Sequence, residues 1–310
     1  MSRRLRLILH GKAAGDPRVR AAVAAVREDG HAVDVRVTWE GGDAQRFATE
    51  AMADAATGRL DVLVAGGGDG TLNEVVSAAL AAAPEPACAF GLLPLGTAND
   101  FAHAAGVPVD DLTAALRLTT ERVAVPIDVG TLNDRVFVNM LTGGFGTVVT
   151  AQTDPQLKKL MGGAAYVVTG IARFAELTAY DGTFTGPDFA WSGQFLVLAI
   201  GNARQAGGGI PLCEGALVDD GLLELRILPL LEGQALKDAL ARLVEVGLPA
   251  LDEHVVTLST PWLEFSSAQD LHINLDGEQV VANRFRVDCR QHAVMFHLGD
   301  SVLTGAATAG

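Results

Sequence analysis

The first 120 residues alternate between strand-like and helix-like hydrophobic patterns, and this alternation constrains the fold more than any other feature. Apolar runs of strand length occur at residues 5–10, 33–39, 61–65 and 89–93. Helical spacing of apolar residues occurs between and after these runs, at residues 17–29, 42–57, 71–83, 97–105 and 109–119. Strands that alternate with helices in this way form a parallel sheet with helices on both faces.

From about residue 122 the pattern changes to short alternating runs separated by Gly, Asn and Asp. These runs lie at residues 123–128, 135–140, 195–200, 222–228, 255–259, 271–275 and 285–288. They predict a largely antiparallel β domain, with helical segments at residues 155–177 and 233–246. We therefore expect an α/β domain over residues 1–125 and a β domain with a helical insert over residues 126–310. The sequence leaves open whether the C-terminal segment packs back on the first domain.

Charge and hydropathy exclude several classes of protein. The formal net charge is −14 at pH 7, so long-range electrostatics disfavour nucleic acid and anionic membrane surfaces as partners. Lys158 and Lys159 are the only adjacent lysines and would make a weak membrane anchor. The longest stretch without charge, residues 136–153, contains several glycines and threonines, so we expect no transmembrane segment. Any membrane contact should be peripheral.

The cysteines indicate a reducing compartment. Cys88, Cys213 and Cys289 are isolated and form no CxxC pair. Reduced thiols in a cytoplasmic protein are the simplest interpretation. The sequence leaves the oligomeric state open.

The most informative segment is GGGDGT, at residues 66–71, which directly follows the apolar run at residues 61–65 and opens a helical segment. In a parallel α/β sheet such a junction lies at the carboxyl edge, where ligands bind. Consecutive glycines let the backbone approach a phosphate closely, and a helix start offers unpaired N–H groups to an anion. We interpret this segment as a phosphate-binding loop.

Two common nucleotide-binding motifs do not match these glycines. A Walker A loop requires a lysine in GxxxxGK[ST], and that motif is absent from the sequence. The dinucleotide fingerprint GxGxxG, counted from Gly66 and Gly68, would need a glycine where Thr71 stands. A turn followed by a capping box of Thr71 and Glu74 is the structural alternative, but a cap does not require three consecutive glycines.

A second candidate loop, LPLGTANDF at residues 93–101, follows the next apolar run and also opens a helical segment. Gly68 and Gly96 are 28 residues apart, which is about one βαβ unit. We therefore expect the two loops to face one crevice. A Pro/Gly turn capped by Thr97 is the structural alternative.

Helix termini alone would bind a triphosphate weakly. A helix N-terminus contributes about 0.3–1 kcal/mol to an anion, and about 2 kcal/mol at best. Neither loop contains a lysine. The sequence therefore predicts that a divalent cation assists, held by carboxylates elsewhere in the chain.

Two Asp-Gly sites in the second half supply candidate carboxylates. They lie in LVDDGL at residues 217–222 and in NLDGE at residues 274–278. Asp-Gly between apolar runs is a strong hairpin signal, so we expect a hairpin at each site, whether or not its acidic groups also take part in chemistry. The glycine-rich loop at residues 201–209 is either a flexible connection or a loop whose backbone or Arg204 faces the cleft.

Taken together, the motifs GGGDGTLNEV, LPLGTANDFA, ARQAGGG, LVDDGLLELRIL and NLDGE, in this order, resemble the diacylglycerol-kinase catalytic-domain family. The nearest likeness is to bacterial YegS-type lipid kinases, which also have the VTWE stretch at residues 37–40, and it extends over about residues 5–298. GGDGT alone is shared with NAD kinases and phosphofructokinase relatives. The resemblance implies an N-terminal Rossmann-like, three-layer nucleotide-binding domain, a C-terminal β-sandwich domain and an active cleft between them.

The resemblance also assigns roles by position. Asp220 with the carbonyls of Leu217 and Leu222 corresponds to a structural metal site, and Glu278 to the residue that accepts the acceptor hydroxyl's proton. Relatives more often have Asn where His10-Gly11 stands, and often Gly where Ala203 stands. The implied nucleotide contacts are Thr38, Gly66, Gly67, Gly68, Asp69, Gly70, Thr71, Leu72 and Thr97.

The resulting hypothesis is in-line phosphoryl transfer from Mg·ATP to the hydroxyl of a lipid, with phosphatidylglycerol-type phospholipids as favoured acceptors. Asp69 would coordinate Mg²⁺ in part, with Ca²⁺ as a substitute, and Glu278 would deprotonate the hydroxyl. An NAD kinase-like enzyme with a soluble substrate is one alternative. A nucleotide-sensing regulator without turnover is another.

Overall fold

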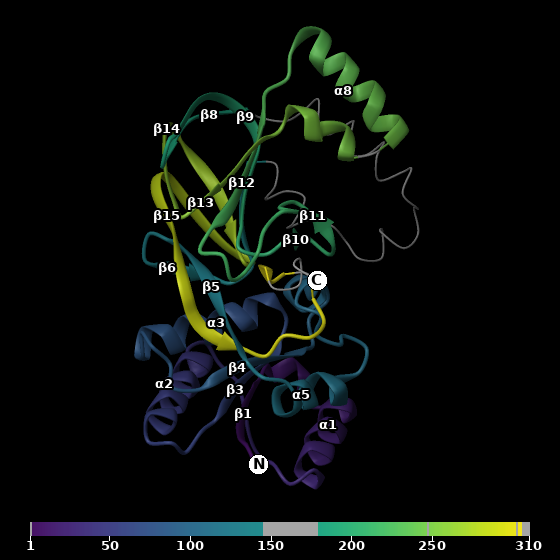
Figure 1. The fold of residues 1–310 in the computed structure, drawn as a ribbon, viewed down its shortest axis with the longest axis vertical. Coiled ribbons are helices and arrows are strands. Elements are labelled where there is room, and N and C mark those ends of the chain that lie inside the picture. The colour runs from purple at the N-terminus through teal and green to yellow at the C-terminus, as the bar shows by residue number, and fades with distance from the viewer. Residues whose placement is uncertain (1, 145–178, 247, 302, 306–310) are drawn as a thin grey trace.

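The computed structural model describes residues 2–144, 179–246, 248–301 and 303–305 (Figure 1). The expected helical insert at residues 155–177, with Lys158 and Lys159, lies outside the described residues. Within the described residues, 13 strands form one continuous hydrogen-bonded sheet, and helices cover its N-terminal part (Figure 1).

The first part of the chain builds a parallel sheet from four apolar strands. These are β1 (Arg4–Leu9), β2 (Ala32–Val37), β3 (Val62–Gly67) and β4 (Ala89–Pro94), which lie in the order β4-β3-β1-β2. All three neighbouring pairs are parallel. The α/β prediction is confirmed.

Helices flank this sheet on both faces, as the alternation predicts. On one side α1 (Pro17–Glu28) packs beside α5 (Leu112–Glu121), and on the other α2 (Asp43–Ala56) packs beside α3 (Asp69–Ala82) (Figure 1). Local chemistry fixes where helices begin. The Asp16 side chain accepts a hydrogen bond from the Arg18 N–H ahead of Pro17, and Asp111 caps α5 in the same manner.

The strand order contains a topological switch point. After β1 the chain adds β2 on one side, and then crosses to add β3 and β4 on the other side. The loops that follow β1 and β3 therefore leave their strands in opposite directions and open a crevice at the carboxyl edge, where ligands bind in open α/β sheets.

The second part is mostly antiparallel. Its strands pack an aromatic core in which the rings of Phe265 and Phe285 stack with their centroids 4.7 Å apart. One helix, α8 (Gly233–Val246), lies outside this core at the far end of the molecule (Figure 1). The strands are β5 (Val125–Leu132), β6 (Arg135–Phe137), β7 (Met140–Gly144), β8 (Tyr180–Gly186), β9 (Phe189–Gly201), β10 (Gln205–Ala206), β11 (Ile210–Pro211), β12 (Leu223–Pro229), β13 (Val256–Thr260), β14 (Trp262–Leu275) and β15 (Glu278–Phe296).

Strand β15 joins the two parts of the molecule. Over its 19 residues it pairs with β14 and β5, and its last residues pair in parallel with β4, with Phe296 opposite Phe90. The N–H of His297 then donates to the carbonyl of Phe90 at 2.9 Å. One strand therefore runs from the β part into the edge of the parallel sheet.

The two Asp-Gly sites differ from each other. Asp276 and Gly277 have positive φ angles of 48° and 99° and connect β14 to β15, so the hairpin predicted there is confirmed. The hairpin predicted at Asp219–Gly221 is wrong. The chain before it forms no strand, because the Val218 backbone bonds to Leu303 and Asp128 instead of to β12.

Two other expectations need correction, and the capping-box alternative is excluded. Helix α3 begins at Asp69 behind Gly68, which makes no side-chain cap, so Thr71 and Glu74 form no capping box. The run at residues 135–140 is divided between β6 and β7. The helix expected at residues 97–105 is the short α4 (Asp100–Ala104), and it begins late because Asn99 is left-handed at φ 51°. Among the described residues, no helix has the length and apolarity needed to cross a bilayer.

Candidate active site

The two glycine loops lie directly against each other. A Cβ atom built on Gly68 would lie 3.0 Å from the Cα of Gly96, and one built on Gly96 would lie 2.5 Å from the Cα of Gly68. Real Cβ atoms do not approach so closely. The loops after β3 and β4 therefore meet backbone to backbone, and the expectation that they face one crevice is confirmed.

The GGGDGT loop turns sharply into α3. A Cβ on Gly67 would overlap the Thr71 side chain, 2.3 Å from its Oγ1. A Cβ on Gly66 would lie 2.9 Å from the Leu7 side chain. Leu72 is buried and anchors the first turn of α3 in the core. These contacts account for the consecutive glycines, since each position has backbone or side chain where a Cβ would be.

The second loop is closed by its own asparagine. Asn99 Oδ1 accepts from the N–H of Gly96 at 2.8 Å, and Asn99 Nδ2 donates to the carbonyl of Gly96 at 2.9 Å. Asn99 is buried, so this pair of bonds is protected from water. Thr97 lies exposed at the tip of the resulting loop.

A pocket of about 440 Å³ opens between the loops and the end of β1. Its position at the β1/β3 switch point is the one expected for a ligand in this topology. Its lining includes two cations, Lys12 and Arg18, which the sequence analysis did not assign to the site. The lining residues are His10, Lys12, Ala13, Asp16, Arg18, Gly67, Gly68, Gly70, Thr71, Leu95, Gly96 and Thr97.

These two cations add positive charge that the sequence analysis had expected only from a divalent ion. Lys12 is exposed and, within the described part of the chain, makes no ion pair. Arg18 pairs with Asp16 at 2.7 Å, with its side chain 66% exposed. The strand–loop–helix pattern at residues 5–18 contains the signal that could have found them, because in this strand order the β1 loop must open on the same crevice as the β3 loop.

Thr38 stands at the end of β2, beside the β1 loop. Its Oγ1 accepts a hydrogen bond from the N–H of Gly11 at 3.3 Å, and its N–H donates to the carbonyl of Leu9 at 3.0 Å. A Cβ on Gly11 would lie 2.3 Å from the Thr38 carbonyl oxygen. Glycine after His10 is thus required by packing against Thr38. Thr38 does not line the pocket itself.

Asp69 holds the second loop to the first. Its Oδ1 accepts from the N–H of Phe101 at 2.9 Å and its Oδ2 from the N–H of Asp100 at 3.1 Å, so it caps α4 across 31 residues of sequence. Burial, with a contribution from the Asp100 carboxylate, raises the pKa of Asp69 above its usual range. Each carboxylate oxygen retains a second lone pair, so the two bonds leave acceptor capacity for a cation.

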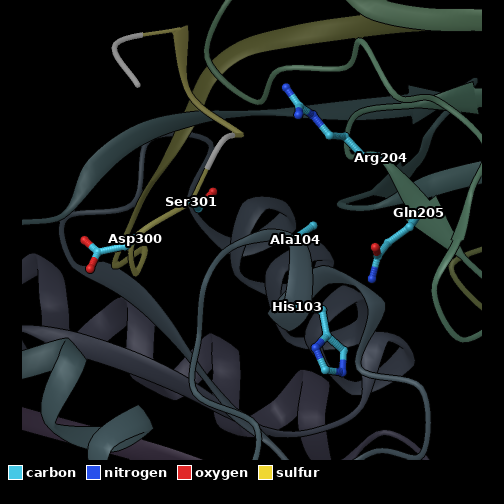
Figure 2. Close-up of a pocket in the computed structure, with 6 residues that line it drawn as sticks. All are labelled: His103, Ala104, Arg204, Gln205, Asp300 and Ser301. Carbon is cyan, nitrogen blue, oxygen red and sulfur yellow. The ribbon is translucent and has the colours of Figure 1, made fainter. Parts of the chain in front are cut away.

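Asp100 extends the connection into the β part. Its two carboxylate oxygens accept from the N–H groups of Gly209 at 2.6 Å and Gly208 at 2.9 Å. The backbone of the loop at residues 201–209 is therefore bonded to α4, and none of these residues lines the pocket between the glycine loops. Arg204 lines a separate pocket of about 520 Å³ between α4 and the β part, where its Nε donates to the carbonyl of Ala216. Figure 2 shows the Gln205 side chain directed toward α4 and Arg204 extending away from it.

The NLDGE turn approaches the GGGDGT loop from the other part of the molecule. A Cβ on Gly70 would lie 3.6 Å from the carbonyl oxygen of Asp276. The buried Asp276 carboxylate accepts three backbone N–H groups, from Val138 at 2.7 Å, Asn139 at 3.1 Å and Met140 at 2.8 Å. Burial raises the pKa of Asp276 to about 7, although these bonds oppose the shift.

Glu278 lies two residues beyond this turn, at the start of β15. Its side chain is 59% exposed, and its Oε2 lies 3.6 Å from Nη1 of Arg135 on β6. Burial, followed by the negative charge of Glu278 nearby, raises the pKa of Glu74 on α3. Glu278 therefore lies near α3 and is accessible to solvent, but it does not line the pocket between the glycine loops.

The predicted structural metal site lies elsewhere. Asp220 Oδ1 accepts from the N–H of Leu222 at 2.9 Å, and the nearby Asp219 accepts from Gly305. Burial, then the charges of Asp128 and Asp219, raise the pKa of Asp220. Among the described residues, no three His, Cys, Asp or Glu side chains are grouped to hold a metal. A site made of Asp220 with the carbonyls of Leu217 and Leu222 remains a prediction.

The comparisons with known proteins agree with this arrangement. Residues 4–132 match the family model described as diacylglycerol kinase catalytic domain, and residues 139–296 match the one described as YegS C-terminal NAD kinase β sandwich-like domain. The predicted combination of an α/β domain with a β-sandwich domain is therefore confirmed.

Relatives align with nearly the whole chain. A protein of Pseudomonas aeruginosa strain UCBPP-PA14, named "probable lipid kinase YegS-like", is 50% identical over 292 residues, covering 94% of this chain and 93% of its own. A protein of the same name from Xanthomonas campestris pv. campestris strain 8004 is 47% identical over 301 residues, covering 94% of this chain and 95% of its own.

Solved structures share the fold. A crystal structure of a diacylglycerol kinase from Bacillus anthracis str. Sterne superposes with a TM-score of 0.68 at 18% identity, covering 96% of this chain and 97% of that chain. Another solved chain from that organism reaches a TM-score of 0.73 at 23% identity, with 96% of both chains covered.

Proposed function

The chain belongs to the diacylglycerol kinase catalytic-domain family and is a lipid kinase, and we propose that it transfers the γ-phosphoryl group of ATP to the hydroxyl of a phospholipid such as phosphatidylglycerol. The observation that carries the proposal is the contact of the Gly68 and Gly96 loops beside Lys12, with the turn that carries Glu278 against Gly70. In this proposal the donor site and the candidate base lie beside each other.

The donor's phosphates would lie in the pocket at the switch point. The first N–H groups of α3 are unpaired within the helix, and the missing Cβ atoms at Gly67, Gly68 and Gly96 let an anion approach them. Lys12 and Arg18 add charge that helix ends alone do not supply. The residues present therefore fit a nucleotide triphosphate.

Mg²⁺, or Ca²⁺ in its place, would neutralise the charge that develops on the transferred group. Asp69 is the residue that would hold this ion in part, because it lies within the GGGDGT loop and its burial makes a nearby cation favourable. A second ion at Asp220, with the carbonyls of Leu217 and Leu222, would brace the β part. Thr38 would contact the nucleotide from the end of β2.

Glu278 would orient the acceptor hydroxyl and remove its proton. An exposed carboxylate at the rim of the crevice can be reached by a headgroup that stays attached to a membrane. Arg135 lies 3.6 Å from this carboxylate, and a guanidinium at that place favours an acceptor whose hydroxyl is close to an anionic phosphodiester. This pairing supports a phospholipid over a neutral acceptor. We place the reaction at the cytoplasmic face of a membrane, with peripheral contact only.

The test measures transfer of label from γ-labelled ATP with Mg²⁺ to phosphatidylglycerol, to diacylglycerol and to NAD, each at matched concentration. We expect labelled phosphatidylglycerol in excess of labelled diacylglycerol, and none of it with Glu278→Gln. Label on NAD alone would support the soluble-substrate alternative. ATP binding without any labelled product after long incubation would support the regulator.

A further inference from the structure

Trp39 is the most exposed large apolar side chain among the described residues. It is 82% exposed to solvent, whereas the largest fully buried side chains of the protein, several of them phenylalanines, are less than 2% exposed. It makes no ring–ring or cation–π contact among those found in the described part of the chain. An indole exposed to water contributes little to the stability of the fold, so we consider which ligand outside the chain it could contact.

Trp39 lies beside the loop that follows β1, and this position indicates which ligand its side chain could contact. Trp39 follows Thr38 at the carboxyl end of β2, and β2 is the strand next to β1. The β1 loop contacts Thr38 through Gly11, and its neighbours His10 and Lys12 line the phosphate pocket. Adjacent strands are about 4.8 Å apart, and β1 lies between β2 and β3. The backbone of Trp39 is therefore roughly two strand spacings, about 10 Å, from the β3 loop.

Two other sides of the pocket between the glycine loops and the end of β1 are occupied by parts of the chain. On the β4 side, α4 is tied to Asp69 and, through Asp100, to Gly208 and Gly209. On the side of the β part, the turn at Asp276 lies against Gly70. A nucleoside attached to phosphates in this pocket therefore extends over the β1 loop toward the end of β2.

The backbone at Trp39 is held in place. The buried Asp43 carboxylate accepts from the N–H of Trp39 at 2.8 Å and of Glu40 at 3.2 Å, and it also pairs with Arg46 at 2.6 Å. These bonds hold the pKa of Asp43 below its usual range, and the bond from the N–H of Trp39 has the largest effect. The Asp43 carboxylate is therefore ionised at neutral pH. A backbone that is already fixed reduces the conformational freedom that is lost when a ligand stacks on the indole.

We propose that Trp39 is the platform on which the base of the donor nucleotide stacks. The proposal rests on the donor site of the proposed function and adds the residue that holds the base. Stacking of a base on an aromatic side chain has a typical effect of about 5- to 160-fold on affinity, and it accepts any base, since every base has a π-face. The donor site should therefore bind purine nucleotides by stacking strength, without strict selection of the base.

A membrane surface is the other partner that an exposed tryptophan suggests. The side chains next to Trp39 disfavour it, because Glu40 is exposed and the chain carries a net charge of −14. Membrane insertion of Trp39 is therefore an outcome that the experiment must detect and that would overturn the proposal.

The experiment uses the full chain and titrates ATP and base-free tripolyphosphate into wild type, Trp39→Ala and Trp39→Phe, with calorimetry and tryptophan fluorescence. Val123→Ala is the matched control, since it removes another exposed apolar side chain, 81% exposed, outside the pocket. Trp191 and Trp262, which lie on β9 and β14, supply the fluorescence background.

We expect ATP to quench wild-type fluorescence and tripolyphosphate to leave it nearly unchanged. Trp39→Ala should weaken ATP binding about 5- to 160-fold and leave tripolyphosphate binding unchanged, while Trp39→Phe retains most of the affinity. Equal ATP affinity in wild type and Trp39→Ala would overturn the proposal and leave the proposed function standing.

Two further results have distinct meanings. Failure of wild type to bind ATP at all would overturn the proposed function and this inference with it. If Trp39→Ala loses binding to vesicles of phosphatidylglycerol while its ATP affinity is unchanged, Trp39 belongs to a membrane contact and the proposal is wrong.

Discussion

Gly68 and Gly96 touch through their backbones, so that a methyl group on Gly96 would lie 2.5 Å from the Cα of Gly68. The two residues belong to loops that follow neighbouring parallel strands, and neither loop can move toward the other. Both loops line the pocket, and the contribution of each can be tested separately.

Gly96→Ala should disable the donor site. The new Cβ forces the two loops apart, at a typical cost of about 1–3 kcal/mol, and changes the spacing of the N–H groups that face the pocket. We expect loss of at least tenfold in ATP affinity, measured by calorimetry, with a moderate fall in Tm. Gly41→Ala is the matched control, since a Cβ there meets nothing within 4 Å. Unchanged affinity in Gly96→Ala would contradict the assignment of the pocket.

Lys12→Ala should weaken nucleotide binding through charge alone. Loss of one charge-assisted contact to a phosphate typically costs about 1.5–3 kcal/mol, so we expect roughly a tenfold or larger rise in Kd. The slope of log Kd against log salt should also fall, because one fewer cation contributes. Arg20→Ala removes a neighbouring cation that does not line the pocket, and it should leave both quantities unchanged.

Asp69 and Glu278 should separate stability from catalysis. Asp69 accepts two backbone N–H groups at the start of α4, so Asp69→Ala should abolish lipid phosphorylation and also lower the free energy of unfolding by about 1–3 kcal/mol. Glu278 is 59% exposed, so Glu278→Gln should abolish activity with no change in Tm. Activity in either variant close to wild type would remove that residue from the mechanism, and a wild-type Tm for Asp69→Ala would contradict its capping role.

Two buried groups should give stability opposite dependences on pH. Burial raises the pKa of Asp276 from 3.8 to about 7, so its contribution to stability is full below about pH 4 and decreases as the pH rises to about 7. Burial, with repulsion from Arg3, lowers the pKa of His297 from 6.5 to about 4, so its contribution decreases as the pH falls from about 6.5 to 4. Between about pH 4 and 6.5, the stability contribution of Asp276 therefore decreases with rising pH while that of His297 increases.

Single variants should reveal each slope in denaturant unfolding measured from pH 4 to 7. His297→Gln should lose stability as the pH rises, and Asp276→Asn should gain it, each by an amount on the order of 1–3 kcal/mol across the window. Parallel curves for wild type and both variants would show that neither pKa is shifted. Arg3 Nη1 lies 3.2 Å from Nε2 of His297, so the curve of Arg3→Ala should be shallower at low pH.

The strands and long helices of the first part could be predicted because their hydrophobic periodicity is local. The boundary of α4 could not, since its start depends on the left-handed Asn99 and on Asp69, which is 31 residues away. Strand β8 did carry a signal that the sequence analysis passed over: Gly182 and Phe184 are buried in alternation with exposed Asp181, Thr183 and Thr185.

The candidate site divides in the same way. The glycine loops and the Asp276 turn were predicted from residues adjacent in sequence. Lys12 was missed, because its place in the pocket follows from the order of the strands and not from any spacing around it. The predicted hairpin at Asp219–Gly221 failed because Val218 finds its partners in Asp128 and Leu303, both far away along the chain.

Strand β15 has a consequence for anyone who works with pieces of this protein. Its last residues pair with Ala89 and Phe90 at the outer edge of β4, and that strand belongs to the half that holds the glycine loops. A fragment that stops at residue 132, where the match to the catalytic-domain model ends, would lack these partners and leave backbone groups of Ala89 and Phe90 unpaired at the edge of an apolar strand. Such a fragment should aggregate on expression, and co-expression of the rest of the chain, which contains β15, should keep it in solution.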